Sequence, residues 1–273
     1  MPNLATLPEM EQLLSKVLSF NWKVVTLGCI KGGEGKSTTL LNLSRIFASF
    51  GIRVLIIDID PQHNATRNIY PEYRKDLDKS IVTALTMPSH FQRCIAREIE
   101  PNISVIPGSL DITDLGTMTP NKLKMILEVQ RTEQPGQFNL VLIDTPGRWD
   151  MQVEAGYAAA DYILTPASID DSFALDTVGY LMEKFISHQP QCIPKWHVCL
   201  NFVRKEEKSN IGRKLYYLKG FPVLQEEIPF STRIQEAREQ RRTLDSKKMF
   251  EGIYEPHLEL AKSILTELGV SNG

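Results

Sequence analysis

The stretch Ile30–Thr39 reads I-K-G-G-E-G-K-S-T-T and decides the fold of this chain. Gly32, Gly33 and Gly35 stand among few bulky side chains, and glycine lets a backbone turn so tightly that several N–H groups face one anion. The apolar run 23–29 precedes the stretch and predicts a buried strand. Apolar residues recur at helical spacing after it: Leu40, Leu41, Leu43, Ile46 and Phe47.

A strand, a glycine loop and a helix start therefore follow one another. Loop amides and the helix dipole both favour negative charge, so the segment predicts a phosphate-binding loop. Lys36 would give the β- and γ-phosphates of a nucleotide a cation, and the Ser37 hydroxyl is placed for Mg²⁺. An ordinary glycine turn is the alternative, but the G-K-S-T ending favours a nucleotide. The common pattern G-x-x-x-x-G-K-[ST] is missed by one residue, because Ile30 stands at its first glycine and Lys31 follows.

Two further apolar runs end in aspartates. Arg53–Asp58 predicts a buried strand that continues to Asp60, and Phe138–Asp144 predicts another, followed by T-P-G. The carboxyl ends of parallel strands face the ligand crevice of a doubly wound sheet, so we expect Asp58 and Asp60 to serve Mg²⁺ and the attacking water, and Asp144 to hold Mg²⁺. Mg²⁺ keeps much of its water shell, which suits a strand-end carboxylate. The alternative for Asp58 and Asp60 is that these carboxylates cap the next turn.

The lysine-first loop resembles the deviant Walker A motif of the ParA/MinD family of ATPases. Two other stretches share this resemblance: I-D-I-D-P-Q-H-N-A-T is similar to the switch D-x-D-P-Q-x-N-A-T, and I-P-F-S-T-R-I-Q-E-A is similar to I-P-x-x-x-R-x-x-E-A. The resemblance runs from Lys23 to about Leu268 and is closest to ParA (Soj-like) partition ATPases. It implies a P-loop NTPase architecture that binds ATP and Mg²⁺. His63 replaces a glycine common in the family and is given no catalytic role; Gly147 stands where a proline is more usual.

The resemblance also implies roles for matching residues. Lys31, Lys36 and Asp60 are the catalytic candidates: Lys31 reaches across a dimer interface to the partner's nucleotide, and Asp60 orients or deprotonates the attacking water. The metal candidates are Ser37, Asp60 and Asp144. The nucleotide-binding candidates are Lys31, Gly32, Gly33, Glu34, Gly35, Lys36, Ser37, Thr38, Asn201 and Pro229. The last two are expected beside the adenine.

The D-T-P-G sequence also looks like the D-x-x-G switch of GTPases, so the nucleotide base could be guanine or adenine. GTPases of that type read guanine with N-K-x-D. The candidate strand His197–Asn201 continues as F-V-R, with no aspartate to read guanine. Adenine is therefore preferred.

Strands that alternate with helices predict an α/β fold with a mostly parallel, doubly wound sheet covered by helices on both faces. The region 70–100 is expected to form one or two helices that include Ile95. Pro120 is expected to open a helix with Leu123, Ile126, Leu127 and Gln130 inward. We expect residues 1–22 to form an N-terminal helical extension, with a helix over 4–20, and residues 23–273 to form a single P-loop ATPase domain.

Composition excludes several classes. Of the 273 residues 42% are hydrophobic, enough for a sizeable core, and the net charge of −2 neither favours nor excludes nucleic acid. The four cysteines lack C-x-x-C spacing, so neither a zinc site nor a disulfide framework is expected. No apolar run approaches a membrane span of about 18 residues, and no signal peptide is recognised, so a cytoplasmic protein is expected.

The family resemblance implies a homodimer formed on ATP binding, non-specific DNA binding in that state, association with the nucleoid, and slow hydrolysis stimulated by a ParB-like partner. Residues 233–248 hold six basic and three acidic side chains. Such a run is usually a solvated face, but the resemblance favours a DNA contact. The DNA-binding candidates are Arg233, Arg238, Arg241, Arg242, Lys247 and Lys248.

Three alternatives share the same loop. A MinD-like regulator of cell division would need a basic amphipathic C-terminal tail, and residues 266–273 contain no basic residue. An amidoligase would need a second substrate pocket, for which no motif is seen. A positioning ATPase for a non-DNA cargo would look the same in sequence, so the cargo, whether chromosome, plasmid, phage genome or protein assembly, stays open.

Overall fold

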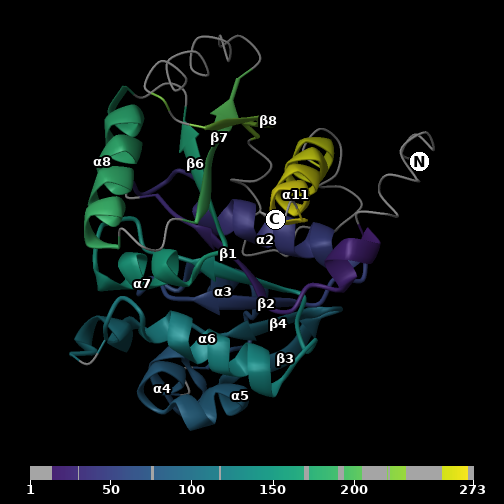
Figure 1. Cartoon of the computed structure of the whole chain (residues 1–273), viewed down its shortest axis with the longest axis vertical. Coiled ribbons are helices and arrows are strands. Elements are labelled where there is room, and N and C mark those ends of the chain that lie inside the picture. Colours follow the sequence, from purple (N-terminus) through teal and green to yellow (C-terminus); the bar gives the residue numbers. More distant parts are fainter. Residues whose placement is uncertain are drawn as a thin grey trace.

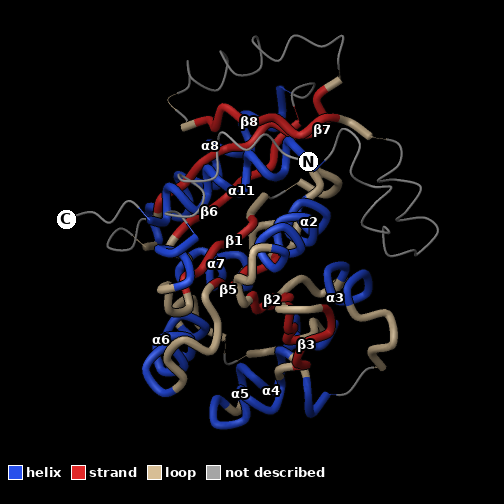
Figure 2. Tube along the Cα trace, turned by 90° about the vertical axis from the view of Figure 1, so that its right-hand side faces the viewer, coloured by secondary structure: helices blue, strands red, loops and turns tan. Residues whose placement is uncertain are grey.

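The computed structural model describes residues 14–29, 31–74, 77–116, 118–168, 172–189, 194–204, 220, 222–231 and 254–269. Within these ranges eight strands form one sheet in the order β3-β4-β2-β5-β1-β6-β7-β8. The strands are β1 (Lys23–Leu27), β2 (Val54–Asp58), β3 (Ala96–Glu100), β4 (Ile103–Ile106), β5 (Leu140–Asp144), β6 (Tyr162–Ser168), β7 (Lys195–Val203) and β8 (Val223–Pro229). All neighbours pair in parallel except β3 and β4. The two edge strands, β8 and β3, lie far apart in Figure 2.

Helices cover both faces of this sheet (Figure 1). The α-helices are α2 (Lys36–Ser49), α3 (Asn64–Ile69), α4 (Ile81–Thr86), α5 (Phe91–Cys94), α6 (Lys122–Glu133), α7 (Met151–Ala159), α8 (Ser172–His188) and α11 (Tyr254–Gly269). Short 3-10 turns are η2 (Leu77–Lys79), η3 (Pro88–His90) and η4 (Leu110–Asp114). The predicted doubly wound, P-loop NTPase-like fold is confirmed.

Alternation along the strands divides the core between the two faces, as the two-residue period of a strand requires. On β1, Val25 and Leu27 share a buried cluster with α2 and α11, whereas Val24 lies in the cluster formed with α4, α5 and α6. The inward side of α6 is as predicted: Leu123, Ile126, Leu127 and Gln130 are all buried.

The edge of the sheet was predicted wrongly. Between residues 70 and 100 the sequence indicated helices alone, but Ala96–Glu100 forms the antiparallel strand β3, and Ile95 ends α5 rather than continuing it. The strand reads A-R-E-I-E, is only partly buried and pairs irregularly with β4. Charged residues are typical of edge strands and hide the apolar signal on which the prediction depended. At the opposite edge, Val223–Pro229 forms the strand β8.

The N-terminal helix is described only from residue 14, and residues 14–18 are helical. Val17 is fully buried in the cluster with α2 and α11, as expected for packing on the main body, whereas Leu18 is 44% exposed. Trp22 is fully buried, and its indole N–H donates to the carbonyl of Gln134 at 2.9 Å. This tryptophan fixes the junction with β1. The sequence also predicts a helix from about residue 232, and this segment lies outside the described residues.

Candidate functional site

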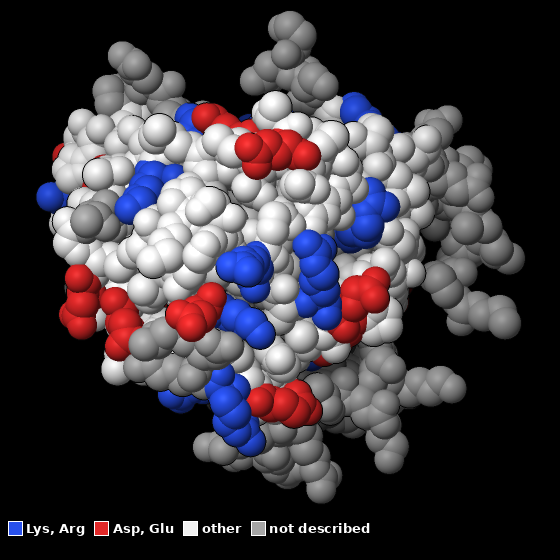
Figure 3. Space-filling model, turned by 90° about the horizontal axis from the view of Figure 1, so that it is seen from below, with Lys and Arg blue, Asp and Glu red and all other residues white. Residues whose placement is uncertain are grey.

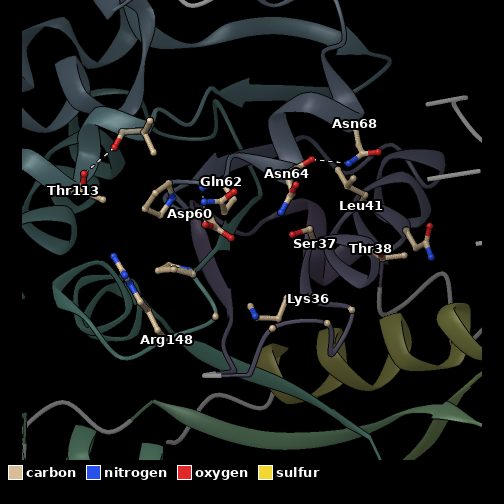
Figure 4. Close-up of a pocket in the computed structure, with 18 of the residues that line it drawn as sticks. Lys36, Ser37, Thr38, Leu41, Asp60, Gln62, Asn64, Asn68, Thr113 and Arg148 are labelled. Carbon is tan, nitrogen blue, oxygen red and sulfur yellow. Dashed lines mark hydrogen bonds between the residues drawn. The ribbon is translucent and has the colours of Figure 1, made fainter. Parts of the chain in front are cut away.

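A cavity of about 460 Å³ opens at the carboxyl edge of the central strands (Figure 4). It lies where β1 leads into α2, beside the ends of β2 and β5. Its lining residues include Gly32, Gly33, Gly35, Lys36, Ser37, Thr38, Asp60, Gln62, Asn64, Asn68, Thr113 and Arg148. The lysine-first loop thus forms one wall, and segments that follow β2, β4 and β5 supply the others.

Backbone conformation forces glycine at two positions of the loop. Gly33 and Gly35 have φ of 92° and 83°, in the left-handed region that side chains disfavour. At Gly35 there is also no space, because an added Cβ would lie 2.5 Å from Nδ2 of Asn201. That amide donates to the carbonyl of Glu34 at 2.7 Å, so the end of β7 supports the loop from behind.

Lys36, Ser37 and Thr38 open α2 and line the cavity. The Lys36 side chain is drawn toward the loop, where its ammonium donates to the carbonyl of Lys31 at 3.4 Å. Only 7% of Lys36 is exposed. A cation and the first turn of a fourteen-residue helix therefore face the same space, which favours a multiply charged anion there.

Strand register brings the acidic residues together. Asp144 is the partner of Leu27 on β1 and of Asp58 on β2, so all three strand ends lie at one level. Oδ2 of Asp144 accepts a 2.6 Å hydrogen bond from the Ser37 hydroxyl. Oδ1 of the same carboxyl is buried and has no hydrogen-bond partner within the described ranges. Burial, followed by the charge of Asp58, raises the pKa of Asp144 well above its usual range.

These groups fit Mg²⁺. A buried oxygen of Asp144 without a partner and the adjoining Ser37 hydroxyl are hard oxygen donors, as that cation prefers. The described residues contain no group of three or more His, Cys, Asp or Glu side chains arranged for a metal. A small number of protein ligands is enough for a magnesium ion that arrives with a nucleotide, because phosphate and water oxygens supply the other ligands.

The two aspartates after β2 have different environments. Asp58 is fully buried, and its Oδ2 accepts from both the N–H and the hydroxyl of Thr66, at 2.8 and 2.7 Å. Burial raises the pKa of Asp58 to about 7. Asp60 instead lines the cavity, and its Oδ1 accepts from the N–H of Gln62 at 2.8 Å. Burial also raises the pKa of Asp60. Asp58 therefore holds the turn, whereas Asp60 is available to a ligand.

Two loop residues from the sequence-based set lie outside the lining. The ammonium of Lys31 is 3.2 Å from Oε1 of Glu34, and the Glu34 side chain is only 4% exposed. Among the residues that line the cavity, the loop contributes Lys36 but not Lys31.

The remaining predicted residues fall in three groups. Asn201 supports the loop and is 2% exposed, and Pro229 ends β8; their predicted place beside an adenine stays a prediction. His63 is the residue before α3, and its Nδ1 lies 3.0 Å from the carbonyl of Pro61. The DNA-binding candidates, all between residues 233 and 248, lie outside the described residues.

The structure adds lining residues that sequence reasoning missed. Asn64 and Asn68 come from α3, Arg45 from α2, and Arg148 from the segment after β5. Arg45 also forms a bidentate pair with Glu100 at 2.7 to 3.3 Å. Asn64 belongs to the switch stretch and Arg148 follows D-T-P-G directly, so proximity to the motifs was the available signal. Arg45 and Asn68 line the cavity because of how α2 and α3 are placed, which no local motif indicates.

Comparison with known proteins supports the family resemblance. The family model described as an AAA domain matches residues 22–194, more than half of the chain. The chain belongs to this ParA/MinD-type family. It is 26% identical over 164 residues to the sporulation initiation inhibitor protein Soj of Bacillus subtilis, covering 59% of this chain and 63% of Soj. It is 27% identical over 164 residues to the chromosome partitioning protein ParA of Caulobacter vibrioides, covering 59% and 61%.

Among solved structures, the ATP complex of a McdA variant from Cyanothece superposes with a TM-score of 0.77. The match covers 93% of this chain and 99% of that one at 18% identity, and so shows the fold. The chain spans less than two thirds of the length of Soj and ParA. Within its described part, no helix of this ParA/MinD-type protein is long and apolar enough to cross a membrane.

Proposed function

We propose that this protein is a Mg²⁺-dependent ATPase of the partition type, which converts ATP and water to ADP and phosphate. The observation that carries the proposal is the cavity lined by Lys36 and Ser37, together with the hydrogen bond from the Ser37 hydroxyl to Asp144, whose second carboxylate oxygen is buried without a partner among the described residues. Similarity to Soj and ParA supports a partition role, and the ATP in the related McdA structure supports the choice of adenine nucleotide.

Each residue has a role set by its position. Lys36 and the loop amides stabilise the charge of the γ-phosphate, and Thr38 lies one residue further into the helix for the α-phosphate. Ser37 and Asp144 would hold Mg²⁺, which neutralises charge on the phosphates when bound. Asp60 lines the cavity, which supports a role in orienting the attacking water or accepting its proton.

Nucleotide-dependent dimerisation is part of the proposal. Two facing loops would bring two triphosphates together, and a lysine donated by each subunit would offset their repulsion. Lys31 suits this role, because it belongs to the loop yet does not line its own cavity.

Light scattering with ADP and then with ATP, on an Asp60→Ala background that slows hydrolysis, should show a monomer-to-dimer shift with ATP alone. Adding Lys31→Ala should abolish the shift while ATP still binds, because the repulsion is then no longer offset. Lys122→Ala, on α6 and away from the lining, is the matched control and should dimerise normally. A dimer that persists in the Lys31 variant would contradict its role in trans.

We further propose that the ATP-bound dimer binds DNA without sequence preference, lies on the nucleoid in the cytoplasm, and is stimulated by a ParB-like partner. On the face in Figure 3, basic and acidic side chains are interspersed, and no broad area of one sign is visible. That face does not suggest a phosphate-binding surface. The basic run 233–248 is the candidate that the family resemblance favours.

Replacing Arg241 and Arg242 with Glu should weaken binding of the ATP form to unrelated duplexes about equally. It should also flatten the salt dependence, since each neutralised phosphate contributes about −0.9 to the slope of log affinity against log salt. Anisotropy titrations at several salt concentrations measure both. Arg93→Glu with Arg97→Glu, exposed on α5 and β3, is a charge-matched control. Unchanged affinity in the first pair would place the DNA surface elsewhere; no binding even at low salt would favour a non-DNA cargo.

A further inference from the structure

The two lysines of the loop have different surroundings. Lys36 faces the cavity, whereas the ammonium of Lys31 lies 3.2 Å from Oε1 of Glu34, three residues along the same loop. The Lys31 side chain is 34% exposed and its acidic partner 4%. The pair therefore joins a partly exposed cation to a nearly buried carboxylate.

Glu34 is fixed from both ends. Its Oε2 accepts a 2.7 Å hydrogen bond from the N–H of Ser168 at the end of β6. Its main-chain carbonyl accepts from Asn201 on β7 at 2.7 Å. The glycine that follows has no space for a Cβ against this asparagine, so the loop is clamped here. Glu34 cannot follow Lys31 if the lysine moves, and any movement must separate the two charges.

Separating Lys31 from Glu34 costs free energy, and the net cost depends on which anion becomes the new partner of Lys31. A carboxylate excluded from water is destabilised when its charged partner leaves, because only the Ser168 N–H would remain of the contacts described here. Lys31 will leave only for a site of greater negative charge. A triphosphate offers more charge than a diphosphate, so the exchange favours ATP over ADP.

We propose that Glu34 is a positioning residue that retains Lys31 within its own subunit until ATP is bound on both sides of the dimer. The inference rests on the proposed function and adds a nucleotide check to it. When ATP bridges two subunits, Lys31 exchanges Glu34 for the partner's phosphates. When the γ-phosphate is lost, Glu34 recaptures the lysine and the dimer separates.

The test is Glu34→Gln on the Asp60→Ala background. Glutamine keeps one oxygen to accept from the Ser168 N–H, removes the charge, and presents an NH₂ group in place of the oxygen that faces Lys31. Because its size and the Ser168 hydrogen bond are kept, thermal unfolding should stay near that of the parent. Sedimentation velocity across ATP and ADP titrations is expected to show half-maximal dimer at an about tenfold lower ATP concentration, with dimer appearing in ADP as well. Glu154→Gln, a 7%-exposed carboxylate on α7 that lies 3.2 Å from His188, is the matched control and should shift neither titration.

Repeating the substitution with Lys31→Ala tests whether Glu34 acts through the lysine. Because Lys31→Ala by itself is expected to abolish the dimer, the double variant should form no dimer in ATP or in ADP. Three results would each overturn the inference: the same shift toward dimer in the absence of Lys31, an unchanged ATP midpoint in the Glu34→Gln variant, or a raised ATP requirement in that variant. The last result would mean that Glu34 aims Lys31 at the partner. A parent protein that forms no dimer with ATP would overturn the proposed dimer and this exchange together. A normal parent dimer with an unresponsive Glu34 variant would overturn the exchange alone.

Discussion

Lys36→Ala is expected to abolish ATP binding. Lys36 is only 7% exposed and lines the cavity, so its charge is held close to the proposed phosphates. It also lies at the helix start, where the loop amides and the helix dipole act on the same anion. Isothermal titration with Mg·ATP should show affinity reduced well beyond tenfold, more than about 1.4 kcal/mol.

Two controls sharpen this measurement. Lys122→Ala removes the same charge from α6, outside the lining, and should bind ATP like the parent. Thermal unfolding should show that Lys36→Ala still folds, because the substitution relieves a nearly buried charge rather than creating one. Affinity retained within about tenfold would mean that this loop is not the nucleotide site.

Asp60→Ala is expected to keep ATP binding and lose turnover. A carboxylate that orients water acts in the transition state and adds little to ground-state affinity, so kcat should fall far more than binding. The variant should then accumulate as the ATP-bound dimer. Phosphate release measured with and without a stimulating partner tests this, and Asp78→Ala, exposed on η2, is the control. Hydrolysis at the parent rate in the Asp60 variant would move the role to another group.

The acid side of the pH–rate profile gives a second readout for Asp60. Burial raises its pKa, so the carboxyl takes up a proton at a higher pH than an ordinary aspartate. The protonated form cannot accept a proton from water, and the rate should therefore fall as pH drops through this raised pKa. The parent should lose hydrolysis in mild acid while ATP binding persists, and residual activity of Asp60→Asn should lack that limb.

The sequence by itself determined the loop, the strands that lead to it and the fold class, because these features depend on local patterns. Glycine spacing and the G-K-S-T ending specify the turn into α2, and uninterrupted apolar runs specify the buried central strands. Gln130 could be placed inward because helical spacing overrides the polarity of a single residue. The edge strand β3 could not be seen, since its charged residues carry no apolar period.

Only the tertiary structure decided which charged residues are buried and which line the cavity. Asp58 and Asp60 look equivalent in the sequence, but strand register and the packing of Thr66 bury the first and leave the second on the cavity wall. Arg148 and Asn68 reach the same cavity from separate segments, which only the order of the strands could arrange. Glu34 is held by Ser168 on β6 and Asn201 on β7, two strands that are distant from it in the sequence. Because its side chain is nearly buried, the proposed exchange of Lys31 depends on the charge of the bound nucleotide.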